Sequence, residues 1–299
     1  MTEKKFLYHL LAFFTIIIWG TTYVSTKLLL LAGFNPVEIL ICRFSLAYFF
    51  ICFFSPKRLF ADNWKDELQM VGLGLFGGSL YFMAENTSLS ITLASNVSLI
   101  TATAPILTAI VAHCFSHDYR IDHNVIYGSI VAMIGVAFVV YNGNFIFKIN
   151  PLGDMLAFIG ALMWAFYGLL LKKMGKKYSS SFITRKVFFY GVFTLIPVMS
   201  KYVHFSFKMF QSPIIWGNLL FLGLIASFLC YLTWNIASKK LGVVSVSNYI
   251  YVSPVVTLIS AAVILHEQIT FIAIIGAIFI LLGVYVAQQG FNFFLNKHH

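Results

Sequence analysis

Three side chains within one short apolar stretch have the types and spacing to bind an organic solute. The segment WGTTYVSTK places Trp19, Tyr23 and Lys27 at intervals of four residues, so on a helix they share one face. The two rings offer flat apolar surfaces that also attract cations. Lys27 either reaches the outer membrane surface, roughly 6 Å away, or turns inward and pairs with an acid. We expect the inward, paired placement.

Charged side chains also occur at other places inside apolar segments. Charges within a bilayer are costly, and they usually pair, face the bundle interior or mark a pathway. Glu85 is the one acid well inside a segment, so we predict that it pairs with Lys27 or Arg43. A pair that only locks the helices together is an equal alternative. The predicted set of interacting charges is Lys27, Glu38, Arg43 and Glu85.

Aromatic and amide side chains in other segments complete a predicted binding cavity. One segment supplies a charge at Glu85, and another supplies an aromatic face at Trp234. That combination suits a substrate with a polar or cationic group and an apolar body. Ordinary packing is the alternative for any single aromatic residue. The predicted lining consists of Trp19, Tyr23, Tyr81, Glu85, Asn86, Trp164, Tyr231, Trp234, Asn235 and Tyr251.

Other residue patterns argue against catalysis, metal binding and a cofactor. His113 and His117 are spaced like a zinc-binding pair, but the sequence has no strong third ligand beyond the adjacent Asp118. The four cysteines lie in apolar segments without a CxxC motif, as buried thiols do. Histidines lie mostly at segment ends, which disfavours a membrane-embedded enzyme. A nucleotide-binding loop is absent, so we expect no direct drive by ATP.

The elements that hold these residues follow from the composition. The 299 residues are 60% hydrophobic and 10% charged, with a mean hydropathy of +0.88, whereas soluble domains carry roughly a quarter charged residues. Such a chain is typical of a polytopic membrane protein. A window of about 20 apolar residues predicts ten helices, at 8–31, 36–54, 68–89, 93–115, 123–142, 152–171, 183–203, 215–238, 243–265 and 269–288. The first lacks a small-residue cleavage site, so we interpret it as a retained membrane helix.

Lysine and arginine are distributed unevenly between the two sides of the predicted membrane. With a cytoplasmic N-terminus, thirteen fall in inside segments and three in outside loops. The positive-inside rule then places both termini in the cytoplasm. Topology also explains the net charge of +10, so we expect no nucleic-acid partner. The basic cluster at 172–177 is expected to contact anionic lipid.

The chain also repeats itself. A shift of 149 residues matches Gly74 with Gly223, Asn86 with Asn235, Ser98 with Ser247, Pro105 with Pro254, and Thr108 with Thr257. Nearby shifts match Trp19 with Trp164, Arg43 with Arg185, Gly128 with Gly276, and Gly135 with Gly283. Five helices are an odd number, so the second copy enters the membrane from the opposite side. We therefore predict an all-α membrane protein of ten transmembrane helices in two inverted five-helix repeats, 1–145 and 146–299, within a single transmembrane domain.

Two pairs of repeat-matched residues could control movement. Pro105 and Pro254 each remove a backbone hydrogen bond and free a carbonyl, which allows a hinge, a cavity wall or a static kink. Asp118 and Glu267 would lie at opposite membrane faces, where they suggest a gate or a helix-end role.

These motifs together resemble the drug/metabolite transporter superfamily, specifically its EamA group of ten-helix proteins. The resemblance covers essentially the whole chain. It depends on WGTTYVSTK at 19–27, on CRF at 42–44, on Pro105 and Pro254, and on the closing pattern of Glu267, Gly276 and Gly283. The first copy departs from the family pattern, with Asp118 in place of the usual Glu. The resemblance implies a bacterial inner-membrane carrier, often an exporter of amino acids or other small metabolites.

We therefore predict a secondary transporter that moves small, amino-acid-like organic metabolites outward by alternating access. Its partners would be a small-molecule substrate and membrane lipid, with no cofactor, and the protein would be a monomer or weak dimer. A proton-coupled multidrug exporter is a close alternative, with Glu85 as the proton carrier. A carrier of phosphorylated solutes or nucleotide sugars is a further alternative, because Lys27, Arg43 and Arg185 could supply cations.

Overall fold

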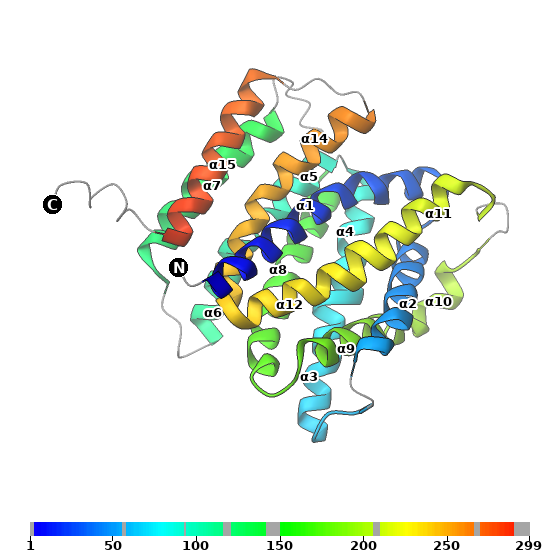
Figure 1. Ribbon diagram of the computed structural model, residues 1–299. Helices are drawn as coiled ribbons and strands as arrows, with labels where there is room; N and C mark the ends of the chain where they lie inside the picture. Colours follow the sequence, from blue (N-terminus) through cyan, green and yellow to red (C-terminus); the bar gives the residue numbers. More distant parts are fainter. Residues whose placement is uncertain are drawn as a thin grey trace.

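The computed structural model describes residues 3–55, 58–92, 94–115, 121–141, 150–205, 210–265 and 270–289, and the regular elements among them are helices (Figure 1). Up to residue 141 they are α1 (Glu3–Leu31), α2 (Pro36–Phe54), α3 (Trp64–Gly74), η1 (Leu75–Ser79), α4 (Leu80–Ile91), α5 (Ala94–Thr101), α6 (Ala104–Phe115) and α7 (His123–Tyr141). From residue 151 they are α8 (Pro151–Gly175), α9 (Ser180–Phe193), α10 (Ile196–Tyr202), α11 (Pro213–Leu220), η3 (Phe221–Leu229), α12 (Cys230–Leu241), α13 (Val243–Ser247), η4 (Asn248–Val252), α14 (Ser253–Leu265) and α15 (Phe271–Gln289).

Six of the described helical stretches are long and apolar enough to cross a membrane, or seven if α9 and α10, bent by 50°, form one span. Several predicted spans are therefore not single straight helices. The predicted span 68–89 lies within a continuous run from α3 through η1 to α4. The predicted span 93–115 is divided into α5 and α6. A proline lies in the first turn of α6 and of α10, where its missing N–H would otherwise bond to the preceding turn.

Helix starts are fixed by capping residues that are visible in the sequence. Asn35 caps α2 in a capping box with Glu38, whose side chain binds the backbone N–H of Asn35 at 2.9 Å. Pro36 follows at the first helical position, where proline costs no hydrogen bond. The same Asn–Pro pair, Asn150 and Pro151, begins α8. These caps set the orientation in which α2 and α8 enter the bundle.

Two π-helical segments lie at repeat-matched positions. η1 begins directly after Gly74, and η3 contains the matched Gly223 as its third residue. π-helical turns are rare and often occur at functional sites. Pro105 and Pro254 also occupy matching places, each in the first turn of a helix that follows a break, α6 and α14. The predicted gate residues Asp118 and Glu267 lie outside the described residues.

α7 and α15 lie side by side in close contact along their length (Figure 1). Matched glycines allow this contact, because a Cβ on Gly128 would lie 2.6 Å from the Gly283 carbonyl oxygen, and one on Gly135 would lie 2.6 Å from that of Gly276. Small residues let helix backbones approach within a membrane. The sequence repeat thus produces a helix pair that is nearly symmetric.

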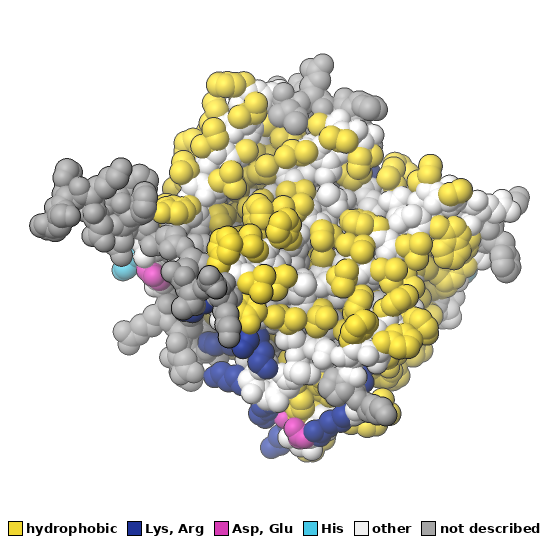
Figure 2. Space-filling model, in the orientation of Figure 1, with side chains coloured by type: hydrophobic (Ala, Val, Ile, Leu, Met, Phe, Trp, Pro, Cys, Tyr) yellow, Lys and Arg dark blue, Asp and Glu magenta, His cyan; other side chains and the backbone are white. Residues whose placement is uncertain are grey.

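Apolar side chains cover most of the face in Figure 2, as expected for a surface in contact with lipid. Lys and Arg side chains gather instead at the lower end of that face, where α3 begins in Figure 1. On this face, the positive charge of the described residues is therefore concentrated at one end.

Candidate functional site

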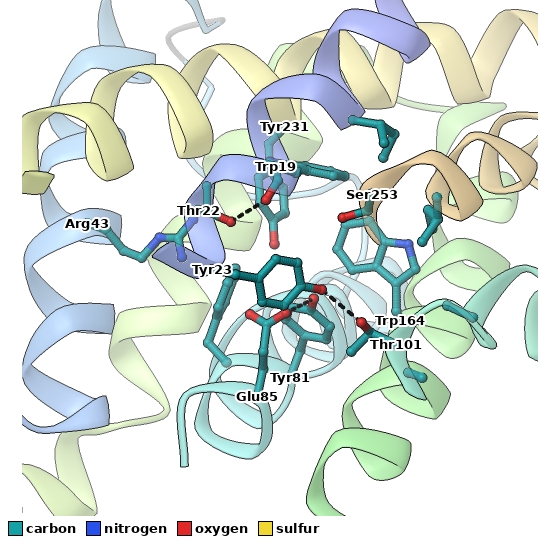
Figure 3. Close-up of a pocket in the computed structure, with 15 residues that line it drawn as sticks. Trp19, Thr22, Tyr23, Arg43, Tyr81, Glu85, Thr101, Trp164, Tyr231 and Ser253 are labelled. Atoms are coloured by element: carbon teal, nitrogen blue, oxygen red, sulfur yellow. Dashed lines mark hydrogen bonds between the residues drawn. The ribbon is translucent and has the colours of Figure 1, made fainter. Parts of the chain in front are cut away.

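A cavity between helices of both sequence copies is the candidate site (Figure 3). It encloses about 50 Å³, enough for a few water molecules at roughly 10–15 Å³ each. An organic solute therefore requires some of the surrounding rings to move. The lining residues are Ile16, Trp19, Thr22, Tyr23, Arg43, Tyr81, Phe82, Glu85, Thr101, Ala104, Ala161, Trp164, Tyr231, Ile250 and Ser253.

Trp19 of α1 occupies the centre of the aromatic wall. Its ring centroid lies 5.3 Å from that of Trp164, 5.6 Å from that of Tyr231 and 5.0 Å from that of Trp234. The first two contacts are edge-to-face, an arrangement that aromatic pairs prefer. Trp19 and its repeat match Trp164 are therefore in direct contact.

The two π-helical segments hold this wall in place. The Trp19 indole N–H donates to the Ala226 carbonyl in η3 at 2.8 Å, and the Tyr231 hydroxyl donates to the Gly77 carbonyl in η1 at 2.6 Å. Gly77 and Ala226 are matched by the 149-residue shift. Each copy thus provides a π-helix carbonyl that anchors a cavity ring from the other copy.

Glu85 provides the acid of the cavity. The Tyr81 hydroxyl donates to its Oε1 at 2.6 Å, and the Tyr23 hydroxyl lies beside the same carboxylate (Figure 3). Tyr23 also hydrogen-bonds Thr101 at 2.8 Å. The side chain of Glu85 is 8% exposed. Its carboxylate is therefore held by neutral hydroxyl groups and faces the cavity.

Arg43 of α2 provides the cation. Its Nε donates to the Ser227 hydroxyl at 2.9 Å, and its guanidinium carbon lies 4.2 Å from the centre of the Phe82 ring. Its charge attracts that of Glu85, but no carboxylate oxygen of the described residues lies within 4.0 Å of it. The cavity thus holds one buried positive group and one buried negative group without a direct ion pair.

Lys27 lies outside this cavity. Its Nζ donates to the Leu89 carbonyl at 2.7 Å, and the expected ion pair with Glu85 is not formed in this structure. Glu38 is likewise used elsewhere, accepting the backbone N–H groups of Asn35 and His204. A carbonyl at the end of a helix carries partial negative charge, so it can replace the acid that the sequence suggested for Lys27.

Four predicted lining residues do not line the cavity in this structure. Trp234 packs against Trp19, while Tyr251 is fully buried elsewhere. The repeat-matched asparagines join equivalent helix pairs: Asn86 donates to the Pro36 carbonyl at 3.3 Å, and Asn235 donates to Thr184 at 2.9 Å. Asn235 also accepts from the Tyr167 hydroxyl at 2.6 Å. In this structure, the two asparagines hold helices together rather than facing the cavity.

The sequence prediction also missed several lining residues. Ile16 lies three residues before Trp19 and seven before Tyr23, a helical spacing that places it on the same face and could have indicated it. Thr101 is the last residue of α5 and Ser253 is the first residue of α14, so each lies next to a change of helix. Among the described residues, no group of three or more His, Cys, Asp or Glu side chains could hold a metal ion.

The model of the EamA-like transporter family matches this sequence twice, at residues 6–141 and 151–288. The chain belongs to the EamA-like transporter family. It is therefore a membrane transporter within the drug/metabolite transporter superfamily. The two matched stretches correspond to the two copies seen in the sequence repeat.

Several relatives of the chain are named as transporters. The chain is 30% identical over 267 residues to an uncharacterised transporter of Bacillus subtilis, covering 85% of each chain. It is 24% identical to a protein of Escherichia coli named as a probable amino-acid metabolite efflux pump, covering 94% of each chain. A solved crystal structure superimposes with a TM-score of 0.72 at 16% identity, over 94% of this chain and 95% of the other, which shows a shared fold.

Proposed function

We propose that this chain is a secondary carrier that exports small, amino-acid-like metabolites by alternating access around the cavity. The observation that carries the proposal is the cavity itself, where aromatic walls from both copies surround Glu85 and Arg43. The names of efflux pumps among the relatives support an outward direction. The predicted substrate-binding residues that line the cavity are Trp19, Tyr23, Tyr81, Glu85, Trp164 and Tyr231.

The proposed topology has ten spans in two inverted repeats, 1–145 and 146–299, with both termini in the cytoplasm of a bacterial cell. The double family match and the basic end of the bundle support it. Single cysteines can be introduced at Lys177 and Lys201 in a cysteine-free protein. A membrane-impermeant maleimide should label Lys201→Cys in intact cells, and Lys177→Cys only after permeabilisation. The reverse pattern would overturn the topology.

Movement would come from the helices on either side of the breaks. Pro105 and Pro254 sit where α6 and α14 begin, so each can serve as a hinge. Asp118 and Glu267 are proposed to act at the ends of those helices. Rocking of one repeat against the other would then expose the cavity to each side in turn.

Counterflow in liposomes tests the carrier proposal. Purified protein in liposomes loaded with unlabelled phenylalanine should take up labelled phenylalanine above protein-free liposomes. Trp164→Ala should reduce this uptake at least about tenfold, since a central ring would be lost. Trp216→Phe, outside the cavity, is the matched control and should transport normally. Absence of counterflow for every amino acid tested would contradict the proposal.

Proton-coupled multidrug export is a second candidate, because Glu85 lines the cavity. It predicts drug efflux that requires an imposed pH gradient and is lost in Glu85→Gln. The alternative of a phosphorylated solute has less support, because Arg43 lines the cavity whereas Lys27 and Arg185 do not. The negatively charged oxygens of a phosphate group would thus have, among the described residues, a single cavity-lining cation, Arg43, as their partner.

A further inference from the structure

We infer that Arg43 and Glu85 divide the recognition of a zwitterion between them, Arg43 binding the substrate carboxylate and Glu85 its ammonium group. This inference rests on the proposed carrier function. It assigns to Arg43, which the sequence suggested as a structural ion-pair partner, a direct role in choosing the substrate.

The surroundings of Arg43 leave its terminal nitrogens available. Its side chain is 2% exposed, and the hydrogen bond it makes to Ser227 uses only Nε. Among the described residues, no acceptor is within hydrogen-bond distance of the two terminal nitrogens. The Phe82 ring lies under the guanidinium and helps to fix its plane. A planar guanidinium with two free N–H groups matches a carboxylate in a bidentate geometry.

Glu85 offers the complementary group. A carboxylate can accept about four hydrogen bonds, and the described contacts of Glu85 are those of Tyr81 and Tyr23. A substrate ammonium can donate three hydrogen bonds. The rings of Trp19 and Trp164 present faces and edges nearby, so they can hold the apolar body of the substrate.

The charge balance of the cavity selects for a zwitterion. Arg43 and Glu85 are more than 4.0 Å apart, and together they carry no net charge. In an α-amino acid, the two charged groups are attached to one carbon, so one molecule can satisfy both side chains. A ligand with a single charge would leave one buried partner without a counterion, which is strongly unfavourable.

Three ligands with the same apolar body test the assignment. They are phenylalanine, phenethylamine, which lacks the carboxylate, and 3-phenylpropionate, which lacks the ammonium. Isothermal titration with the full-length protein in nanodiscs should give a dissociation constant at least about tenfold lower for phenylalanine than for either analogue. Equal binding of phenethylamine and phenylalanine would overturn the inference without any substitution.

Two variants should shift this preference in opposite directions. Arg43→Gln should abolish the preference over phenethylamine while keeping the preference over phenylpropionate, and Glu85→Gln should do the reverse. The matched controls are Arg185→Gln, at the repeat-matched arginine, and Glu38→Gln, both outside the cavity, and both should keep the wild-type ratios. Ratios between ligands are insensitive to a general loss of stability. A change in Arg43→Gln that is equal for all three ligands would assign Arg43 a purely structural role.

Counterflow separates this inference from the function on which it rests. Phenylalanine counterflow with equal binding of phenethylamine would overturn the zwitterion assignment alone. Absence of both counterflow and binding for the three ligands would overturn both.

Discussion

Two of the contacts between the sequence copies use different chemistry at matching positions. At one contact α3 packs against α9, and at the other α11 packs against α2. The 149-residue shift matches Glu67 of α3 with Trp216 of α11, and the 142-residue shift matches Lys186 of α9 with Phe44 of α2. The matched positions thus carry charged residues in one case and aromatic residues in the other.

A partly buried polar network lies at the contact between α3 and α9. Glu67 pairs with Lys186, accepts from the Tyr190 hydroxyl and accepts the Ala61 backbone N–H at 2.6 Å. Beside it, Asp66 accepts two hydrogen bonds from the Lys177 ammonium, at 2.9 and 3.0 Å, and one from the Tyr178 hydroxyl at 2.9 Å. These are geometrically specific bonds.

The contact between α11 and α2 is mainly apolar. Ile39 of α2 and Leu219 of α11 belong to a buried apolar cluster that also includes residues of α1, of the α1–α2 connection and of η3: Leu29, Phe34, Leu222 and Ala226. Within a bilayer, such packing is not favoured by the hydrophobic effect, because lipid is equally apolar. The comparison therefore teaches that the charged contact specifies one arrangement, whereas the apolar contact tolerates sliding. We expect the α3–α9 end to open as a unit and the α2–α11 end to loosen gradually.

The largest expected effect comes from removing one member of the buried ion pair. Glu67→Gln should lower the free energy of unfolding by about 3 kcal/mol, because Lys186, 4% exposed, would keep a buried charge without a partner. Denaturation with SDS, followed by circular dichroism, measures this. The double variant Glu67→Met with Lys186→Met makes the contact apolar like its counterpart, and it should recover most of the loss. A double variant less stable than the single one would contradict the comparison.

A smaller effect should come from the glycines where the helices approach. A Cβ on Gly74 would lie 2.3 Å from the Tyr190 Cβ, whereas one on Gly223 would meet mainly the flexible Leu46 side chain, at 2.5 Å from Cδ2. Gly74→Ala should therefore cost about 2 kcal/mol and Gly223→Ala about 1 kcal/mol. Gly217→Ala is the control, since no atom lies within 4 Å of its added Cβ. Equal costs at both sites would show that the two contacts are equally rigid.

Acidification should destabilise the protein less than the glycine substitutions do. Its effect should arise at the contact between α3 and α9. Hydrogen bonds from Lys177, with further ones from Tyr178 and Asn63, hold the pKa of Asp66 below its usual value. The folded-state pKa is below the unfolded value, so this stabilisation is present above the unfolded pKa and is lost as pH falls through the folded pKa. Between about pH 6 and pH 3, the melting temperature should fall more in the wild type than in Asp66→Asn. If the melting temperatures of the wild type and of Asp66→Asn fell in parallel, Asp66 would not account for the loss of stability in acid.

The smallest effect is expected at the partly exposed aromatic of the apolar contact. The Trp216 indole N–H donates to the Phe210 carbonyl at 2.8 Å, and the side chain is 49% exposed. Trp216→Phe keeps the ring and removes the donor, so it should cost about 1 kcal/mol or less. The same denaturation assay checks this. A cost equal to that of Glu67→Gln would remove the proposed difference between the two contacts.

The sequence indicated the helical fold and part of the cavity for the same reason. Four-residue spacing predicts a shared helix face, and Trp19 and Tyr23 both line the cavity. Repeat matching also indicated Trp164, which touches Trp19. The same logic did not separate cavity residues from those one layer behind, such as Asn235, because helix rotation is set by packing against neighbours. We expected an acidic partner for Lys27, but its ammonium group donates to the Leu89 carbonyl. Every residue has a backbone carbonyl, so the sequence could not indicate this partner.

The sequence by itself determined that the chain is an apolar helical protein of two related copies, because hydrophobic content, periodicity and self-similarity are local properties of the chain. Only the tertiary structure decided which polar groups meet. It brought Arg43 of α2 and Glu85 of α4 to one cavity without pairing them, and it paired Glu67 with Lys186, far apart in sequence. The distances and rotations at which helices cross determine which polar side chains come into contact. They depend on the glycine contacts and π-helical turns that set how closely, and at what rotation, each helix packs.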